Sequence, residues 1–220
     1  MIVALLGDPV EASLSPLMQN AAFAARGLDS TYVALRVEPA TLEVALRGLV
    51  ALGFAGANIT TPHKLAAAQL VETDLLSVNT LVVNDGRVRG TSTDAAVLDE
   101  LTFERPAILG DGGSATAFAE AVPAARRFSR RTMWPPDVSD CDLVVNATSE
   151  REEVLVELGP GQTLVDLPYP RTATALAAEV GGATVVDGLD VLVAQGAAAF
   201  ELWTGIPAPV DVMRAAVRSA

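Results

Sequence analysis

The sequence predicts an α/β fold with two lobes. Short apolar runs alternate along the chain with longer segments of helical apolar spacing, a pattern typical of sheets covered by helices. Of the 220 residues, 50% are hydrophobic and only 19% are charged, so we expect a buried core and not a disordered chain. The pattern is interrupted after Thr93 and resumes by Pro106, which places the first lobe before this stretch and the second lobe after it.

The elements of the first lobe follow from apolar spacing and turn residues. Ser15 before Pro16 predicts a helix with Ser15 as its N-cap, and Gly27 is a typical residue for the end of that helix. Asp85-Gly86 predicts the turn of a β-hairpin. The predicted strands are residues 2–6, 31–37, 55–59, 80–84 and 87–89. The predicted helices are residues 15–27, 42–53 and 64–71.

The second lobe repeats the alternation of strands and helices with one gap. Its predicted strands are residues 106–109, 125–129, 142–146, 163–167 and 183–186. Its predicted helices are residues 114–122 and 172–180, followed by two last helices over residues 189–204 and 210–219. Pro135 and Pro136 lie where a helix would connect two parallel strands, and interior prolines break helices. We therefore expect no crossover helix between residues 132 and 142.

Charge and cysteine content narrow the class of protein. The formal net charge of −12 opposes binding to nucleic acid and to anionic membranes, so we expect neither partner. A site for an anionic ligand must then supply local cations. Cys141 is the single cysteine, which excludes an intrachain disulfide. The apolar run at residues 2–6 is shorter than the apolar core of a signal peptide, about 7–15 residues, and we expect a cytoplasmic protein.

A glycine-rich turn follows the first strand of the second lobe. Gly110-Asp111-Gly112-Gly113 lies between a predicted strand and a predicted helix, where backbone N–H groups can bind a pyrophosphate. An ordinary strand–helix turn explains the glycines equally well, because the full G-x-G-x-x-G pattern is not met. Arg126, Arg127, Arg130 and Arg131 surround the next strand, where arginine suits the 2′-phosphate of NADP. A solvated basic turn is the alternative.

Polar residues also cluster near strand ends in the first lobe. Ser13 and Ser15 are two residues apart, which places both hydroxyls on one side of an extended segment. Asn58 and Thr60 repeat this spacing at the end of a buried strand. Lys64 follows them, where it could point toward a ligand or lie exposed at a helix start. His63 is the single histidine, so a histidine-based triad is conceivable but a metal cluster is not.

Together these motifs resemble the shikimate dehydrogenase family over nearly the whole chain and in the family's order. The most specific matches are Ser13-Leu14-Ser15-Pro16 and Asn58-Ile59-Thr60-x-Pro62-His63-Lys64. Other matches are Gly7-Asp8-Pro9-Val10, Asn20, Gly56, Asn79-Thr80-Leu81, Gly90, Thr93-Asp94, the glycine turn, Arg131-Thr132, Asn146-Ala147-Thr148, Asp166, Tyr169, Gln195-Gly196, Phe200 and Trp203-Thr204-Gly205.

The resemblance implies an architecture and an activity. It implies a substrate-binding lobe over residues 1–95, completed by the helices of residues 189–220. It implies a Rossmann-like NADP-binding lobe over residues 96–188, shortened here, with a cleft between the two lobes. The implied reaction is the reversible, NADP-dependent reduction of 3-dehydroshikimate to shikimate, on the route to chorismate and the aromatic amino acids. The chain would act as a monomer or homodimer.

The resemblance also implies roles for individual residues. Lys64 and Asp94 would form the catalytic pair. Ser13 and Ser15 would bind the substrate carboxylate with the help of Tyr169. The residues that would bind ring hydroxyls are Asn58, Thr60, Asn79 and Gln195. The residues that would bind NADP are Gly110, Gly112, Gly113, Ser114, Arg130, Arg131, Thr132, Asn146, Thr148 and Gly188.

Several positions depart from the family pattern. The family has histidine at the positions of Ala12 and Gln19 and asparagine at that of Ser92, and a small residue where Asp111 stands in the glycine turn. The Asp111 carboxylate would repel a pyrophosphate. Two alternatives follow: a non-catalytic protein that binds a shikimate-like ligand with a decayed cofactor lobe, and a dehydrogenase of quinate or aminoshikimate.

Overall fold

The computed structural model describes residues 1–220, and the chain divides into two compact units. The first unit comprises Met1–Asp94 and Val193–Ala220, and the second comprises Ala95–Leu192. Each unit contains one five-stranded sheet together with α-helices, which confirms the predicted α/β fold. No helix of the structure is long and apolar enough to cross a membrane.

The sheet of the first unit has the strand order β2-β1-β3-β4-β5. Its strands are β1 (Ile2–Gly7), β2 (Thr31–Arg36), β3 (Gly56–Ile59), β4 (Thr80–Asn84) and β5 (Arg87–Thr91). Strand β1 pairs in parallel with β2 and β3, whereas β4 is antiparallel to both β3 and β5. Asp85 and Gly86 turn β4 into β5 with φ angles of 49° and 74°, which confirms the predicted hairpin.

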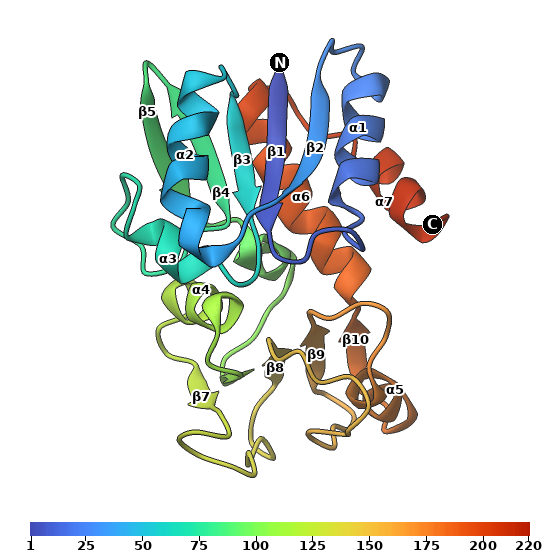
Figure 1. Cartoon of the computed structure of the whole chain (residues 1–220). Helices are drawn as coiled ribbons and strands as arrows, with labels where there is room; N and C mark the ends of the chain where they lie inside the picture. The colour runs from blue at the N-terminus through green and yellow to red at the C-terminus, as the bar shows by residue number, and fades with distance from the viewer. The chain divides into compact units, whose positions relative to one another are not determined.

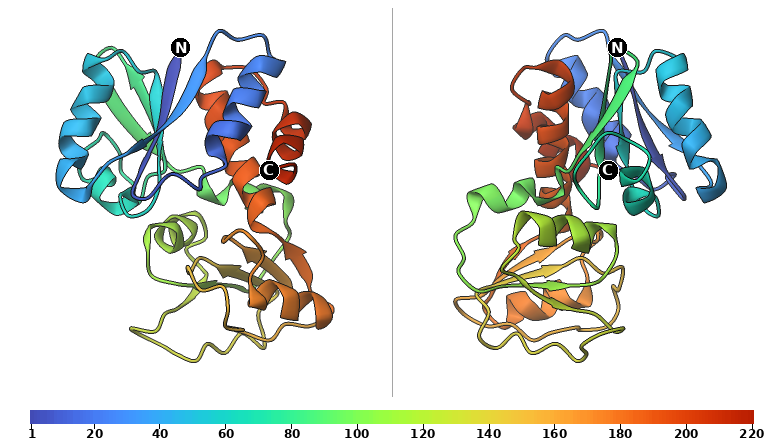
Figure 2. Two further views of the ribbon diagram at one scale, coloured as in Figure 1. Left: turned by 45° about the vertical axis from the view of Figure 1, so that its right-hand side comes forward. Right: turned by 90° about the vertical axis from the view of Figure 1, so that its left-hand side faces the viewer.

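Helices cover both faces of this sheet (Figures 1 and 2). Helix α2 lies over one face, and α1, α6 and α7 lie over the other. The helices of the first unit are α1 (Ser15–Ala25), α2 (Leu42–Ala51), α3 (Lys64–Ala68), the C-terminal part of α6 (Gly188–Thr204) and α7 (Val210–Arg218), with the short 3₁₀ helix η1 (Pro39–Thr41) before α2. Leu42, Leu46 and Leu49 of α2 are buried against apolar side chains of the sheet, as their helical spacing predicts.

The start of α1 differs from the prediction in one detail. Ser15 is the first residue inside the helix, and Leu14 occupies the N-cap position without a side-chain hydrogen bond. The Ser15 backbone N–H instead donates to Ser13 Oγ at 3.2 Å. The prediction of Ser15 as N-cap is therefore wrong. Ser13 Oγ already accepts the Ser15 N–H, and Pro16 in the first turn has no N–H to satisfy, so the helix starts without a Ser15 cap.

The second unit has a parallel sheet with the order β10-β9-β8-β6-β7. Its strands are β6 (Pro106–Leu109), β7 (Arg126–Phe128), β8 (Leu143–Asn146), β9 (Thr163–Asp166) and β10 (Thr184–Val186). Helix α4 (Gly113–Ala121) contacts β6, and α5 (Ala173–Val180) contacts β9 and β10. A 3₁₀ helix, η2 (Asp94–Glu100), starts at the last residue of the first unit and continues into the second, and neither 3₁₀ helix was predicted.

The order of the strands fixes where this sheet can bind a ligand. From β6 the chain first goes to β7 on one side and then to β8 on the other, so the strand order reverses between β6 and β8. Ligands of open α/β sheets bind at the carboxyl ends of the strands at such a switch point. Leu109 pairs with Asn146 there, which brings Gly110 beside Ala147. The chain from β7 to β8 contains no helix, as the two prolines predicted.

Candidate active site

A buried ion pair stands at the centre of the candidate site in the first unit. Lys64 is the first residue of α3, and Asp94 is the first residue of η2. Lys64 Nζ lies 2.8 Å from Asp94 Oδ1 and 2.6 Å from Oδ2, and the two side chains are only 11% and 10% exposed. A buried lysine is costly unless a carboxylate neutralises it, so the pair holds the ammonium in one place.

Asn79 connects this pair to two further side chains. Its Nδ2 group lies 2.8 Å from Asp94 Oδ1 and 3.2 Å from Gln195 Oε1. Its Oδ1 atom accepts the Thr93 backbone N–H at 2.7 Å, which fixes the orientation of the amide. Four of the residues expected at the site, Lys64, Asp94, Asn79 and Gln195, are thus joined by hydrogen bonds although their elements are far apart in the sequence.

The side-chain amide of Asn58 is buried within the sheet and hydrogen-bonded to protein groups. It is buried at the middle of the sheet, on β3, and its Nδ2 donates to the Asn79 carbonyl and to Thr80 Oγ1, each at 3.0 Å. Its Oδ1 accepts the Tyr32 hydroxyl at 2.8 Å. Thr60 follows β3 and is half-buried, and its backbone N–H donates to the Leu6 carbonyl.

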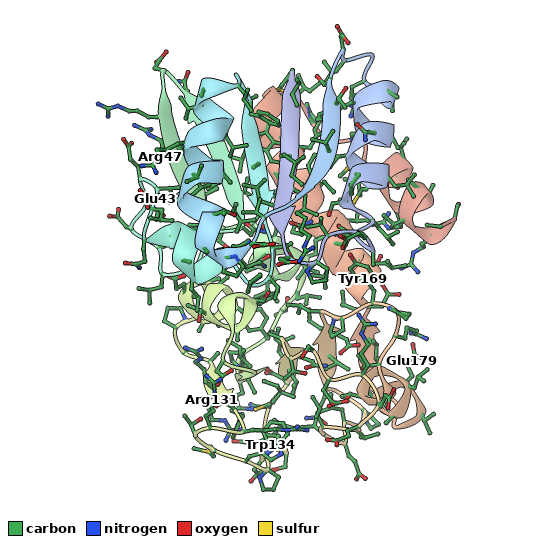
Figure 3. The ribbon with its side chains drawn as sticks, in the orientation of Figure 1. Glu43, Arg47, Arg131, Trp134, Tyr169 and Glu179 are labelled. Atoms are coloured by element: carbon green, nitrogen blue, oxygen red, sulfur yellow. The ribbon has the colours of Figure 1, made fainter.

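The serines lie on the segment before α1. Ser13 is half-buried and Ser15 is buried, and they contact each other through the Ser13 Oγ hydrogen bond. Tyr169, the third residue expected to bind a carboxylate, belongs to the second unit and follows β9. Figure 3 labels it.

Two positions that depart from the family pattern carry unsatisfied oxygen atoms. Gln19 Nε2 donates to the Gly196 carbonyl at 2.8 Å, but Gln19 Oε1 is buried without a hydrogen-bond partner. Ser92 Oγ is also buried without one. Buried polar atoms without hydrogen-bond partners are rare in proteins. Gln19 and Ser92, which replace the family's histidine and asparagine, therefore either lower the stability of the fold or bind a further polar group.

The glycine turn of the second unit has the shape of a phosphate-binding loop. Gly110 has a φ angle of +122°, and an added Cβ would lie 3.0 Å from the Ala147 carbonyl oxygen, so no other residue fits. Gly112 precedes α4, and a Cβ added there would meet no atom within 4 Å. The space beside Gly112 lets a bound group approach the backbone N–H groups at the start of α4.

The two candidate arginines after β7 have different partners. Arg130 donates to Glu153 at 2.6 Å, and its guanidinium carbon lies 5.6 Å from the centre of the Trp134 ring. Arg131 Nε lies 3.5 Å from Asp111 Oδ2 in the glycine turn. Figure 3 labels Arg131 and Trp134 on the segment between β7 and β8. Arg131 is 85% exposed, so its guanidinium can turn from Asp111 to another anion.

Asn146 and its neighbours support the end of β8. Asn146 is buried, and its amide lies between Asp166 Oδ1 at 2.7 Å and Thr148 Oγ1 at 2.7 Å. Burial raises the pKa of the Asp166 carboxyl, although hydrogen bonds from Asn146 and Thr172 lower it. Gly188 approaches the Pro168 carbonyl so closely that a Cβ would lie 2.4 Å from its oxygen.

The remaining expected residues have local partners or a structural position. Thr132 Oγ1 lies 3.0 Å from Ser129 Oγ, and Gly113 and Ser114 begin α4. His63 is buried with Nε2 2.6 Å from the Val37 carbonyl oxygen, which gives it a structural role. No group of histidine, cysteine, aspartate and glutamate side chains could hold a metal ion.

Sequence reasoning named three residues near the ion pair only as parts of motifs or not at all. Thr80 and Thr93 are buried beside Asn79, and Tyr32 is buried on β2. A buried polar residue within an apolar strand was the available signal for Thr80. Nothing in the sequence indicated that the Tyr32 hydroxyl would reach Asn58, because that contact crosses two strand pairings.

Comparisons with known proteins agree with this arrangement. The substrate-binding domain profile of shikimate dehydrogenase matches residues 5–81, and the profile of the shikimate 5′-dehydrogenase C-terminal domain matches residues 188–218. The NADP(+) shikimate dehydrogenase of Moorella thermoacetica is 39% identical over 100% of this chain and 93% of its own length. That of Methanopyrus kandleri is 37% identical over 98% of this chain and 94% of its own length.

Solved structures show the same fold. The shikimate 5-dehydrogenase of Thermus thermophilus, in complex with NADP(H) and shikimate, superposes with a TM-score of 0.85 at 28% identity and covers 100% of this chain and 99% of its own. The shikimate dehydrogenase of Aquifex aeolicus gives a TM-score of 0.86 at 27% identity, over 99% of this chain and 97% of its own. The chain belongs to the shikimate dehydrogenase family.

Proposed function

We propose that this protein is an NADP-dependent shikimate dehydrogenase, which reversibly reduces 3-dehydroshikimate to shikimate. The observation that carries the proposal is the buried Lys64–Asp94 pair in a chain of this family. Curated relatives that match the whole chain are named as this enzyme, which favours catalysis over a ligand-binding protein.

Lys64 is the group that we assign to proton transfer. As the ketone is reduced its oxygen becomes an alkoxide, and an ammonium within hydrogen-bond reach stabilises and then protonates it. Asp94 holds that ammonium through both carboxylate oxygens, and Asn79 holds Asp94. In the reverse direction neutral Lys64 accepts the proton of the shikimate hydroxyl.

Substrate recognition is assigned to the serines and to uncharged polar groups. Ser13 and Ser15 would donate their hydroxyls to the carboxylate, with Tyr169 as a third donor. Thr60 and Gln195 would bind ring hydroxyls. An unmatched buried polar group costs about 1–3 kcal/mol, so such a set discriminates a polyol from its less hydroxylated analogues.

The residues of the second unit fit NADP. Gly110 and Gly112 leave the backbone at the start of α4 accessible, and Arg131 offers a guanidinium to a 2′-phosphate. Asp111 is the one unfavourable charge in this set, and its carboxylate competes with a 2′-phosphate for Arg131. When bound, NADPH supplies the hydride that the ketone carbon accepts.

Location and assembly are part of the proposal. The single cysteine, Cys141, is a buried free thiol, which is typical of proteins from reducing compartments, and we propose a cytoplasmic location. We propose a monomer or homodimer, which light scattering after size-exclusion chromatography distinguishes.

Initial-rate assays with a panel of substrates test the proposal. Purified protein is given shikimate or quinate with NADP or NAD, and formation of the reduced cofactor is followed by absorbance. We expect the highest kcat/KM for shikimate with NADP. A higher kcat/KM for quinate would assign the protein to the second alternative. Binding of shikimate in calorimetry without turnover of any pair would assign it to the ligand-binding alternative.

A further inference from the structure

The buried amide of Asn58 raises the question of what it does in the site. All three of its polar contacts go to the protein, to the Tyr32 hydroxyl, the Asn79 carbonyl and Thr80 Oγ1, at 2.8, 3.0 and 3.0 Å. The side chain is 5% exposed. A group with both N–H donors already used inside the sheet is poorly placed to bind a ring hydroxyl.

The direction of each hydrogen bond is fixed by groups that can only accept or only donate. The Asn79 carbonyl is an acceptor, so Asn58 must present Nδ2 to it and Oδ1 to Tyr32, whose hydroxyl therefore donates. The Thr93 backbone N–H is a donor, so Asn79 presents Oδ1 to it and Nδ2 to the Asp94 carboxylate.

Thr80 joins the two amides. Its hydroxyl accepts from Asn58 Nδ2 and lies 3.1 Å from Asn79 Oδ1 and 3.0 Å from Thr93 Oγ1. Thr80 stands directly opposite Asn58 in the β3–β4 pairing and is fully buried. A chain of donors thus runs from the Tyr32 hydroxyl through Asn58, Thr80 and Asn79 to the carboxylate that holds Lys64.

We propose that Thr80, anchored through Asn58 by the Tyr32 hydroxyl, is a positioning residue for the Asp94–Lys64 pair. This inference rests on the proposed function. Asn58 then acts through Thr80 and the Asn79 backbone and makes no contact with the substrate. Loss of the Thr80 hydroxyl leaves the side-chain carbonyl oxygen of Asn79 held by Thr93 alone. Asn79 then holds Asp94 less firmly, and the ammonium of Lys64 is less well positioned in the transition state.

Isosteric variants of Thr80 separate its hydroxyl from its packing. Thr80→Val keeps the shape and removes the hydroxyl, whereas Thr80→Ser keeps the hydroxyl. We expect Thr80→Val to lower kcat about tenfold with the KM for shikimate within about twofold, and Thr80→Ser to stay near the wild type. Equal losses in both variants, or an unchanged kcat in Thr80→Val, would overturn the proposal.

The anchor is tested by coupling. We expect Tyr32→Phe to lower kcat about fivefold, and the double variant Tyr32→Phe/Thr80→Val to be no slower than Thr80→Val alone. Multiplication of the two losses would show independent effects and refute the chain. Trp203→Phe is the matched control, because it removes a half-buried hydrogen bond to the Leu81 carbonyl next to the Tyr32 ring, outside the chain of donors. We expect its kcat to stay within about twofold of the wild type.

A measurement without turnover keeps the inference separate from the proposed function. In ¹⁵N–¹H NMR spectra, Tyr32→Phe should shift the side-chain amide resonances of both Asn58 and Asn79, and Trp203→Phe should leave those of Asn79 unchanged. A shift confined to Asn58 would overturn the proposal. An inactive wild type would contradict the proposed function only, because the NMR result still decides whether the chain of donors exists.

Discussion

Lys64 and Asp94 carry the chemistry that we propose, and their environment predicts how a variant should behave. Lys64→Ala removes the proton donor, so we expect kcat to fall far more than tenfold while shikimate still binds in calorimetry. Breaking a buried ion pair also costs about 3–5 kcal/mol of stability, so Lys64→Met is measured in parallel to keep the packing.

The exposed Arg47→Ala, which breaks only the surface pair with Glu43 labelled in Figure 3, is the control and should leave kcat unchanged. If Lys64→Ala keeps more than about a tenth of the wild-type kcat, less than about 1.4 kcal/mol is lost and the role assigned to Lys64 is wrong.

Ser13 offers a test of carboxylate recognition. Ser13→Ala removes one hydroxyl that we assign to the substrate and one hydrogen bond to the Ser15 N–H. We expect the KM for shikimate to rise about tenfold or more with little change in melting temperature, because charge-assisted hydrogen bonds are worth about 1.5–3 kcal/mol. Ser139→Ala, at an exposed serine of the second unit, is the control. An unchanged KM would remove Ser13 from the site.

The Asp111–Arg131 pair predicts the cofactor preference. Arg130 is already engaged by Glu153 and Trp134, so we expect Arg131→Ala to erode the preference for NADP over NAD more than Arg130→Ala does. Asp111→Ala should tighten both cofactors and NADP the more, because it frees Arg131 and removes a repelling charge. Fluorescence titration of both cofactors measures this. Equal affinities for NADP and NAD in the wild type would contradict the assignment.

For individual residues, sequence motifs predicted the Lys64–Asp94 pair but not the residues that surround it. Lys64 and Asp94 lie in short motifs that match the shikimate dehydrogenase family, so both residues could be predicted from the sequence. The contacts of Tyr32 and Thr80 with Asn58 depend on the register of the β1–β2, β1–β3 and β3–β4 pairings, which no local sequence pattern encodes. The Arg131–Asp111 contact likewise needed the parallel alignment of β6 and β7.

Asp166, at the end of β9, predicts how the stability of the folded protein depends on pH. Burial raises the pKa of the Asp166 carboxyl, so the folded protein keeps this proton to higher pH than the unfolded chain. The free energy of unfolding therefore falls as pH rises from about 4 through the interval between the two pKa values. Asp166→Asn keeps an acceptor for Asn146 and removes the ionisation.

We expect Asp166→Asn to gain stability relative to the wild type as the pH rises from about 4 to about 7. Urea unfolding over this range measures the difference, with Glu157→Gln, an exposed acidic residue of the same unit, as the control. A difference that stays constant or shrinks with rising pH would contradict the pKa direction assigned to Asp166.

Every predicted strand and helix is present in the structure, with ends that differ by a few residues. The largest difference is α3, predicted to residue 71, which ends at Ala68. The chain turns there because Glu72 N–H donates to the Val88 carbonyl and Gly90 N–H to the Glu72 carbonyl, a contact with β5 that is distant in sequence. Long-range pairing of this kind overrides local helical spacing.

In the whole molecule, the residues proposed for catalysis and those proposed for NADP binding belong to different units. The first unit contains the hydrogen-bonded residues of the proposed catalytic and substrate site, which are Lys64, Asp94, Asn79 and Gln195. The second unit contains Gly110 and Arg131, which we propose to bind the phosphates of NADP. The fold class was predictable because the alternation of strands and helices is a local signal. The resemblance added the direction in which the last helices return.

The central claim is that this one chain interconverts shikimate and 3-dehydroshikimate with NADP. The most direct measurement incubates the purified protein with shikimate and NADP and quantifies both products by chromatography and absorbance. We predict that equal amounts of NADPH and 3-dehydroshikimate form for each shikimate consumed, and that Lys64→Ala forms neither at a comparable rate. Recovery of bound shikimate unchanged in the presence of saturating NADP would contradict the account.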